Sequence, residues 1–247
     1  MKAPHPITLC LVLLLLALPA QRGHCQTVLP AAVGNQSSTL DTAALSLPDT
    51  TWDYRVLKSL QSGRSEGWNR HWLTVSNTFV LAPFTPVGFA VGGLCTNNDP
   101  LRSNQLYADA FEFLGAYALC MGVTMGMKAA FRRPRPWVAY EGDLLCLQPV
   151  RSASFPSGHT STLFVTATSL TLMYPRWYVA MPAYLWAGSV AFSRLYVGAH
   201  YPTDVLAGAL IGTGCAFLAH AVRVRICKEH PELYPPSAVL LPLSFSF

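Results

Sequence analysis

The chain has 247 residues, of which 51% are hydrophobic and only 12% charged, with a formal net charge of +5 and a mean hydropathy of +0.32. A typical soluble domain carries about a quarter charged residues, so this composition favours a membrane setting. The net charge is modest and the aromatic residues are not interleaved with basic runs, which argues against a nucleic-acid surface. An anionic substrate or an anionic membrane face fits better, and the length predicts one main domain.

The first 25 residues have the pattern of an export signal. Met1 and Lys2 give a positive start, the apolar stretch ITLCLVLLLLALPA follows, and Ala20 offers a small residue for cleavage. This stretch is shorter than the roughly 20 residues that span a bilayer, so we predict a signal peptide, with an uncleaved anchor as the alternative. Residues 26–70 are polar and predict an exported linker with a short surface helix around residues 52–60.

Five apolar segments follow, and they are helical in length without the alternation typical of strands. We therefore predict an all-α bundle at residues 71–226, with five membrane spans, and a C-terminal tail at residues 227–247. A soluble helical bundle is the alternative, because several segments are short or carry polar groups such as Asp109 and Glu112. The segments are residues 73–94, interrupted by Pro83 and Pro86, and residues 106–127, 160–173, 178–192 and 205–222.

Two glycine pairs stand four residues apart within these segments. Gly122 with Gly126, and Gly208 with Gly212, have the small-xxx-small spacing that lets two helices approach closely. Such pairs are also frequent by chance in glycine-rich sequence, so each is a candidate contact seam only.

Basic residues at the segment ends predict the orientation in the membrane. If the five segments cross in turn, one side receives Arg102, Arg176 and the basic run RVRICK at residues 223–228. An excess of arginine and lysine favours the cytoplasmic side, so the opposite connections are predicted to face outward. The outward side nevertheless carries six basic residues of its own, which calls for another explanation. They are Lys128, Arg132, Arg133, Arg135, Arg151 and Arg194.

Three polar motifs stand at the helix ends that this topology places on the outward side. They read KAAFRRPRP at residues 128–136, FPSGHT at residues 155–160 and SRLYVGAHYPTD at residues 193–204. Charged groups in apolar surroundings are costly unless they are paired or used, so we predict that the motifs form one site. Its predicted members are Lys128, Arg135, Ser157, Gly158, His159, Arg194, His200 and Asp204.

The first two motifs and Arg194 are suited to holding a phosphate. Lys128, Arg135 and Arg194 supply three cations, the arginines as forked donors and the lysine as a point charge. Ser157 precedes an apolar helix and fits the N-cap position, so the first amides of that helix, from Gly158 onward, would point at an anion.

The two histidines are suited to transferring the phosphoryl group. His200 and Asp204 are four residues apart, with Pro202 placed as the first residue of the last helix. A carboxylate bonded to one ring nitrogen fixes the tautomer and leaves the other nitrogen free to attack. His159 remains as a second histidine that can protonate the departing oxygen. The set predicts a phosphomonoesterase.

Taken together, the three motifs resemble the signature of the type 2 phosphatidic acid phosphatase and vanadium haloperoxidase superfamily: K-x6-RP, PSGH and SR-x5-H-x3-D. Every signature position is matched between Lys128 and Asp204. The resemblance implies an all-helical core bundle and a reaction that needs no metal or other cofactor. It also implies roles: phosphate binding by Lys128, Arg135, Ser157, Gly158 and Arg194, an acid at His159, a phosphohistidine at His200 and support from Asp204.

The predicted substrate is a phosphate monoester or diphosphate on a membrane lipid, such as phosphatidic acid, phosphatidylglycerol phosphate, an isoprenyl diphosphate or a lipid A phosphate. The apolar segments favour this branch, with the active site on the periplasmic or extracytoplasmic side. A soluble exported acid phosphatase of the same superfamily, acting on another phosphorylated small molecule, is the main alternative because of the signal-like start and the long polar segment after it. A non-enzymatic membrane protein is less favoured, since no catalytic residue is missing, and so is a haloperoxidase, which would need a further helical domain.

Two arginines of the first motif, Arg132 and Arg133, lie outside the signature. We predict that they form a solvated basic patch, with contact to substrate or lipid headgroups as the alternative.

Overall fold

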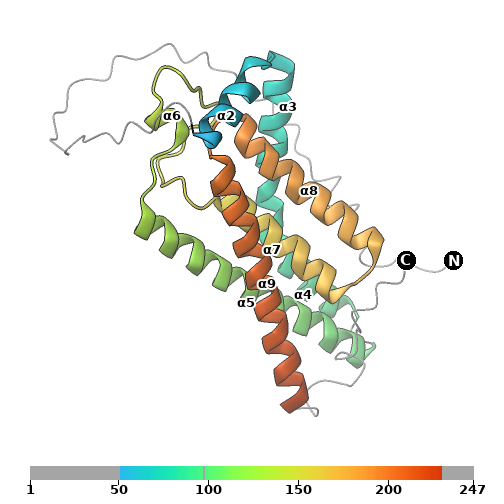
Figure 1. Cartoon of the computed structure of the whole chain (residues 1–247). Helices are drawn as coiled ribbons and strands as arrows, with labels where there is room; N and C mark the ends of the chain where they lie inside the picture. The colour runs from blue at the N-terminus through green and yellow to red at the C-terminus, as the bar shows by residue number, and fades with distance from the viewer. Residues whose placement is uncertain (1–50, 97, 230–247) are drawn as a thin grey trace. The chain divides into compact units, whose positions relative to one another are not determined.

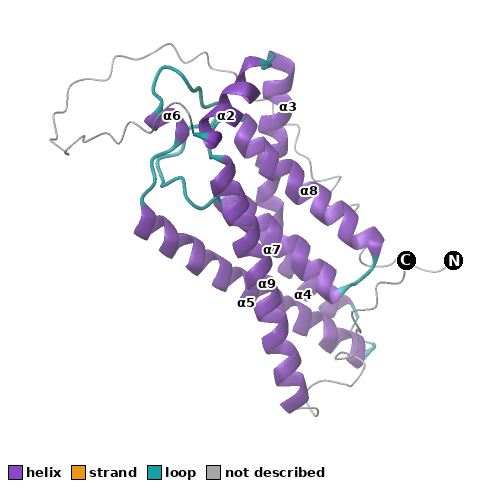
Figure 2. Cartoon of the chain, viewed as in Figure 1, coloured by secondary structure: helices purple, strands orange, loops and turns teal. Residues whose placement is uncertain are grey.

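The computed structural model describes residues 51–96 and 98–229, all within the second of the chain's two compact units, Asp49–Phe247. The predicted export signal and the first part of the linker lie outside these residues. The described part is all-helical, with no strand, which confirms the predicted class (Figures 1 and 2). Its elements are α2 (Trp52–Ser62), α3 (Glu66–Asn77), the 3₁₀ helix η1 (Thr78–Phe84), α4 (Thr85–Cys95), α5 (Pro100–Phe131), α6 (Pro136–Ala139), α7 (Gly158–Met173), α8 (Trp177–Tyr196) and α9 (Pro202–Glu229).

Side-chain caps set the starts of three helices. Thr51, Ser65 and Asp99 precede α2, α3 and α5, and each accepts a backbone N–H from three residues further on, at 3.3, 3.4 and 3.2 Å. Such a cap satisfies one of the N–H groups that have no partner within the first turn. α5 also has Pro100 as its first residue, where the missing N–H costs nothing.

The first predicted apolar segment is broken where the sequence places its prolines. α3 ends at Asn77, the 3₁₀ helix η1 contains Pro83, and α4 carries Pro86 in its first turn. Proline removes a backbone donor and clashes with the preceding turn, so an uninterrupted α-helix cannot pass through both positions. The predicted interruption is confirmed.

α7 forms the centre of the bundle and packs against α5, α8 and α9. Its buried face carries many hydroxyl groups, and these bond to neighbouring helices. Thr166 lies 2.8 Å from the hydroxyl of Tyr117 on α5, and Thr168 lies 2.9 Å from that of Tyr184 on α8. These hydrogen bonds join α7 to α5 and α8, although the buried hydroxyl of Ser169 on α7 has no hydrogen-bond partner within the described residues.

One of the two glycine pairs is a contact seam. A methyl group built at Gly208 would lie 2.6 Å from the carbonyl oxygen of Ser157, and one at Gly212 would lie 2.3 Å from that of Ser161. The backbones of α9 and α7 therefore touch along this line. The other pair, Gly122 and Gly126 on α5, has nothing within 4 Å, so that candidate seam was wrong within the described structure.

Replacing Gly212 by alanine should destabilise the bundle, because the added carbon meets backbone atoms of α7 that no side-chain rotation can move. Overpacking of this kind costs about 1–3 kcal/mol, which should lower the thermal unfolding midpoint in detergent by several degrees. The matched control is Gly122→Ala, which faces open space and should unfold at the wild-type temperature. Equal midpoints for the two variants would show that the seam is not tight.

Three helical stretches are long and apolar enough to cross a membrane: Glu66–Cys95, Pro100–Ala139 and Pro202–Glu229. They support a membrane protein. The two other predicted spans are helical, but α7 has only 16 residues. At 1.5 Å per residue it is about 24 Å long, shorter than the roughly 30 Å of a bilayer core. The number of spans, predicted as five, is therefore not confirmed.

The predicted linker ends earlier than residue 70. α2 packs against α8 and α9 and buries Leu57 completely, and α3 begins at Glu66 (Figure 1). The helix predicted around residues 52–60 is therefore present, but it is part of the bundle rather than a free surface helix. The polar composition of this segment did not predict that α2 packs in the bundle, because α2 is amphipathic and has only one narrow apolar side.

Candidate active site

The third motif bridges α8 and α9, as predicted. Arg194 stands in the last turn of α8, His200 in the connection, and Asp204 in the first turn of α9, which begins at Pro202. The connection turns sharply at Gly198, which has a φ of +75°, a value that favours glycine. A side chain there would also collide with the carbonyl oxygen of Leu145, at 2.3 Å.

Asp204 is completely buried and strongly hydrogen-bonded. Its Oδ2 accepts from the Ser154 hydroxyl at 2.5 Å and from the backbone N–H of Tyr201 at 3.0 Å. Its Oδ1 accepts from Nη1 of Arg133 at 2.7 Å. His200 Nδ1 lies 3.6 Å from Oδ2, beyond hydrogen-bond length. The predicted pair is thus adjacent, but the predicted hydrogen bond is not formed, and Nδ1 has no hydrogen-bond partner within the described residues.

His200 is 2% exposed and faces the first motif. Its Nε2 lies 3.3 Å from Nη1 of Arg135. Because guanidinium nitrogens only donate, Nε2 acts as the acceptor, so any proton on the neutral ring is assigned to Nδ1, toward Asp204. Burial, assisted by Arg135 and Arg194, lowers the pKa of His200 to about 4 against the opposing effect of Asp204. His200 is therefore neutral at physiological pH, with a lone pair directed into the site.

Arg135 and Lys128 are fixed by the loop that precedes α7. Arg135 donates from Nε to the carbonyl oxygen of Ser152 at 2.7 Å, from Nη2 to its hydroxyl at 3.0 Å, and from Nη1 to the carbonyl oxygen of Ala199 at 2.7 Å. Lys128 Nζ donates to the carbonyl oxygen of Ala153 at 2.6 Å. Both cations of the first motif are therefore held by uncharged acceptors, which leave their charges unneutralised, and Arg135 lies beside His200.

Arg194 is fully buried and oriented by two residues from elsewhere in the chain. Its Nη1 donates to the hydroxyl of Ser76 at 2.5 Å and to Oε1 of Gln148 at 2.6 Å. Its Nε is buried and has no hydrogen-bond partner within the described residues. A buried donor without a partner costs free energy, so this nitrogen is available to an anion.

The start of α7 agrees with the prediction in position and differs in one contact. Ser157 is the N-cap and Gly158 the first helical residue, but the serine hydroxyl accepts from the Thr160 hydroxyl at 3.0 Å rather than from a backbone N–H. The backbone N–H of Ser157 donates to the carbonyl oxygen of Asp204 at 3.0 Å. The second motif is thereby joined to the third, and the first amides of α7 remain free of a side-chain cap.

His159 lies in the first turn of α7 with its ring against Phe79, at 3.6 Å between centroids. Burial lowers the pKa of His159 to about 2, with further lowering by the positive charges of the site. The ring is thus neutral until an anion arrives, and a bound phosphate would act in the opposite direction by favouring its protonated form. The groups whose charges act on it are Arg194, His200, Arg135 and Lys128.

The expectation of a solvated basic patch is wrong for Arg133. Its guanidinium donates to Asp53 at 2.8 Å, and to Asp204 and the Thr203 hydroxyl at 2.7 Å each, and it lies 3.9 Å over the ring of Tyr201. Arg132, by contrast, is exposed and ends α5 in the left-handed conformation, with a φ of +45°.

All eight predicted site residues thus lie at one end of the bundle, and the sequence reasoning missed those that hold them. Three cations and one carboxylate give the cluster a net charge of +2, which suits a phosphate dianion. In residues 51–96 and 98–229 no group of three histidine, cysteine, aspartate or glutamate side chains is placed to hold a metal ion; independence from metal stays a prediction. The missed residues are Asp53, Ser76, Phe79, Gln148, Ser152 and Ser154.

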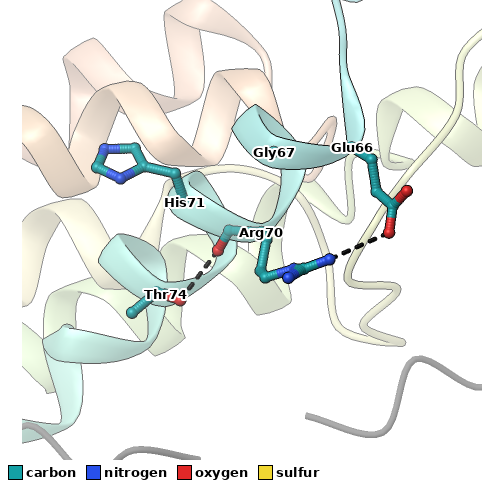
Figure 3. A pocket seen from close by; sticks show the side chains of 5 residues that line it. All are labelled: Glu66, Gly67, Arg70, His71 and Thr74. Atoms are coloured by element: carbon teal, nitrogen blue, oxygen red, sulfur yellow. Dashed lines mark hydrogen bonds and ion pairs between the residues drawn. The ribbon is translucent and has the colours of Figure 1, made fainter. Parts of the chain in front are cut away.

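A separate surface pocket of about 500 Å³ lies on α3 (Figure 3). Its polar groups are engaged with one another: Arg70 pairs with Glu66 at 3.1 Å, and Thr74 donates to the carbonyl oxygen of Arg70 at 2.9 Å. No predicted site residue lines this pocket.

Comparison with known proteins finds a family match for the helical bundle, in which three cations lie around two histidines. Residues 109–226 match the PAP2 superfamily, the family of type 2 phosphatidic acid phosphatases. This match, which covers slightly less than half of the chain, supports the resemblance drawn from the three motifs.

Known relatives are similar over part of their length. A lipid A 1-phosphatase of Rhizobium etli is 32% identical over 57% of this chain and 64% of its own length, so less than two thirds of that relative is matched. The undecaprenyl-diphosphatase BcrC of Bacillus subtilis is 34% identical over 49% of this chain and 58% of its own length. The structure of a transmembrane PAP2 type phosphatidylglycerolphosphate phosphatase from Bacillus subtilis has a TM-score of 0.58, at 21% identity, over 90% of this chain and 96% of that one. This last likeness concerns the fold alone.

Proposed function

We propose that this protein is a phosphatase that hydrolyses a phosphate monoester or diphosphate on a membrane lipid. The observation that carries the proposal is the position of His200, whose Nε2 lies 3.3 Å from Arg135 in a buried cluster of uncompensated cations. A neutral imidazole beside a site of net positive charge has what a phosphoryl acceptor needs. The Nε2 lone pair accepts from Arg135 in the substrate-free structure, a bound phosphate would draw that guanidinium away, and charge would hold the anionic substrate.

In the first step, Nε2 of His200 attacks phosphorus and the bond from phosphorus to the ester oxygen breaks. His159 gives a proton to that oxygen, so the alcohol leaves neutral. The attacking imidazole becomes positively charged, and Asp204 stabilises it from the Nδ1 side. Lys128, Arg135 and Arg194 hold the three phosphoryl oxygens, which is the largest contribution expected in phosphoryl transfer.

In the second step, water hydrolyses the phosphohistidine. His159, now neutral, takes a proton from the attacking water, and the bond from Nε2 to phosphorus breaks. Inorganic phosphate and neutral His200 result, so the site returns to its starting state with protons balanced. The chain's own side chains supply every group in this cycle, and we therefore propose a reaction that needs neither metal nor cofactor.

The lipid substrate is inferred from the apolar helices and from the relatives. The spans Pro100–Ala139 and Pro202–Glu229 each end or begin at a site motif, so the reacting phosphate would sit at the level of the membrane surface. The named relatives act on lipid A and on undecaprenyl diphosphate. The opposite ends carry Arg102, Arg176 and Arg225, which supports an active site on the extracytoplasmic side.

Phosphate release from a substrate panel tests the proposal. The purified protein in detergent is offered lipid A, undecaprenyl diphosphate, phosphatidic acid, phosphatidylglycerol phosphate and the soluble p-nitrophenyl phosphate. We expect a lipid to be preferred, inhibition by vanadate, which resembles the five-coordinate phosphoryl transition state, and no loss with a chelator. Preference for the soluble ester, with recovery outside the membrane fraction, would favour an exported acid phosphatase. No phosphate release from any substrate would favour a non-enzymatic membrane protein.

Activity should persist into acidic conditions. His200 attacks only when neutral, and its lowered pKa of about 4 means that it gains a proton only as the pH falls through that value. The acid limb of kcat/KM, which reports the free enzyme, should therefore lie near pH 4 and not near the ordinary histidine value of about 6.5. Phosphate esters themselves titrate near pH 6. Substrates whose phosphate groups have different pKa values distinguish titration of His200 from titration of the substrate. Only a limb that is set by the phosphate group moves from one substrate to the next. A limb fixed near pH 6.5 for every substrate would contradict a buried, neutral His200.

A further inference from the structure

Helix α2 lies outside the segment that matches the family, yet it brings a carboxylate to the site. Asp53, in its first turn, is 8% exposed and lies between the first motif and the start of α9. Figure 1 shows α2 beside the ends of α8 and α9, which it contacts. A buried carboxylate is costly unless paired, so its partners indicate what it does.

The first partner of Asp53 is the beginning of α9. Asp204, the third residue of that helix, accepts the N–H of Tyr201, which is one half of a capping box. Tyr201 cannot supply the other half, because its phenolic oxygen makes no hydrogen bond within the described residues. Instead Oδ1 of Asp53 accepts the backbone N–H of Thr203 at 3.0 Å. Asp53 thus caps α9 from another helix and fixes the turn that carries Asp204.

The second partner is Arg133. Its Nη2 donates to Oδ2 of Asp53 at 2.8 Å and its Nη1 to Oδ1 of Asp204 at 2.7 Å, so one guanidinium is shared by two carboxylates. With Asp53 absent, the whole charge of Arg133 would act on Asp204. Asp204 would then be less able to stabilise positive charge on His200, which lies 3.6 Å away.

We propose that Asp53 is a positioning residue for the phosphatase reaction: it caps α9 and neutralises Arg133, so that the negative charge of Asp204 remains directed at His200. This inference rests on the proposed function for its kinetic consequence. Asp53 acts through Arg133 and Thr203 and does not touch the substrate.

The variant Asp53→Asn removes the charge while its amide oxygen can still accept the N–H of Thr203. The Thr203 hydroxyl, which donates to Oδ2 of Asp53 at 2.6 Å, would then have to accept from the amide nitrogen. We expect kcat to fall on the order of tenfold with KM nearly unchanged, as for other residues that orient a catalytic group. We also expect the acid limb of kcat/KM to move to lower pH, since uncompensated Arg133 disfavours protonated His200. An unchanged kcat and pH profile would overturn the inference.

Two further comparisons distinguish the effect of the Asp53 charge from an effect of α2 docking against the bundle. Asp143 holds the outer side of α2 through Tyr54 and Lys58, so Asp143→Asn loosens the helix without touching Arg133. It should retain wild-type kcat, and an equal loss in both variants would overturn the inference. In an Arg133→Gln background, Asp53→Asn should have little further effect, because its target is gone. Additive losses would show that Asp53 does not act through Arg133.

A measurement that does not depend on turnover tests the role of Asp53 separately from the proposed phosphatase activity. Titration of His200, followed by NMR in protein with ¹⁵N-labelled histidine, should show a lower pKa in Asp53→Asn than in the wild type. That shift is expected even if no substrate is found, whereas a wild-type protein without phosphatase activity would overturn only the proposed function. An identical titration in both proteins would overturn the role of Asp53 alone.

Discussion

His200→Ala should abolish turnover while the protein remains folded. If His200 forms the covalent intermediate, its loss removes the phosphoryl acceptor, and removal of a nucleophile lowers kcat by about 10³-fold or more. The three cations proposed to bind the phosphate have other acceptors, so substrate binding should survive. These acceptors are Ala153 for Lys128, Ser152 for Arg135, and Ser76 with Gln148 for Arg194. The measurement is phosphate release from the preferred substrate. It is accompanied by thermal unfolding, which should show a folded protein.

His159→Ala distinguishes the nucleophile from the acid. p-Nitrophenolate leaves without needing a proton, so this variant should still be phosphorylated by p-nitrophenyl phosphate. The phosphohistidine should then accumulate, because no base activates the water. Acid-labile, base-stable labelling after a rapid quench identifies it. Labelling of His159→Ala but not of His200→Ala is the expected pattern. Phosphate release by His200→Ala near the wild-type rate would contradict the mechanism.

The sequence predicted the parts of the site that are specified locally. The N-cap position of Ser157, the helix start at Pro202 and the break near Pro83 follow from backbone rules that act within one turn. Each was found where predicted. The convergence of the three motifs could also be predicted, because alternating helices return their ends to one side of a bundle.

The residues that orient the site could not be predicted in this way. Asp53, Ser76 and Gln148 bond to groups that lie roughly 50 to 150 positions away in the chain, and no spacing rule connects them. Asp53 has the sequence context of an ordinary first-turn acid, since it follows the N-cap Thr51. Its function depends on how α2 docks, which is a property of packing.

Arg133 illustrates the same limit within a motif. Arg132, Arg133 and Arg135 are near neighbours in the sequence with identical chemistry, yet one is exposed, one is shared by two carboxylates and one faces His200. Arg132 adopts the left-handed conformation and ends α5. Helical spacing therefore no longer predicts the direction of the side chains that follow it. The resemblance to the signature implies phosphate binding for Arg135 and implies no role for Arg132 or Arg133.

A second charged cluster joins α5 to α9, about 28 Å along α9 from Asp204 at 1.5 Å per residue. Arg223 Nη1 lies 2.5 Å from Asp109 and 2.8 Å from Glu112, and both acidic side chains are at most 2% exposed. His220 Nδ1 lies 3.0 Å from Glu112, and the Tyr174 hydroxyl donates to Asp109 at 2.7 Å. This separation nearly matches the bilayer core, so the cluster would close the bundle at the opposite face.

Arg223→Ala should therefore cause the largest loss of stability among single changes in these helices. It would leave Asp109 and Glu112 buried beside each other without the charge of the arginine, in contact only with Tyr174 and His220, and breaking such a pair costs about 3–5 kcal/mol. The apparent unfolding midpoint in detergent should fall on the order of 10 °C. Arg225→Ala is the matched control, because that side chain is 81% exposed and pairs only with Glu229 one turn away. Exposed pairs of this kind contribute about 0.2–1 kcal/mol, so the control should stay near the wild type.

Neutral replacements for Asp109 and Glu112 distinguish two causes of the lower stability of Arg223→Ala: unpaired carboxylates and lost side-chain volume. If the lower unfolding midpoint of Arg223→Ala comes from unpaired carboxylates, a triple variant should restore most of it. This variant combines Arg223→Met with Asp109→Asn and Glu112→Gln, so that none of the three side chains carries a charge. If it comes from the lost volume of the arginine, Arg223→Met alone should recover it. Because the cluster is distant from His200, the triple variant should also keep wild-type kcat. A fall in kcat with a restored midpoint would mean that the two ends of α9 are coupled.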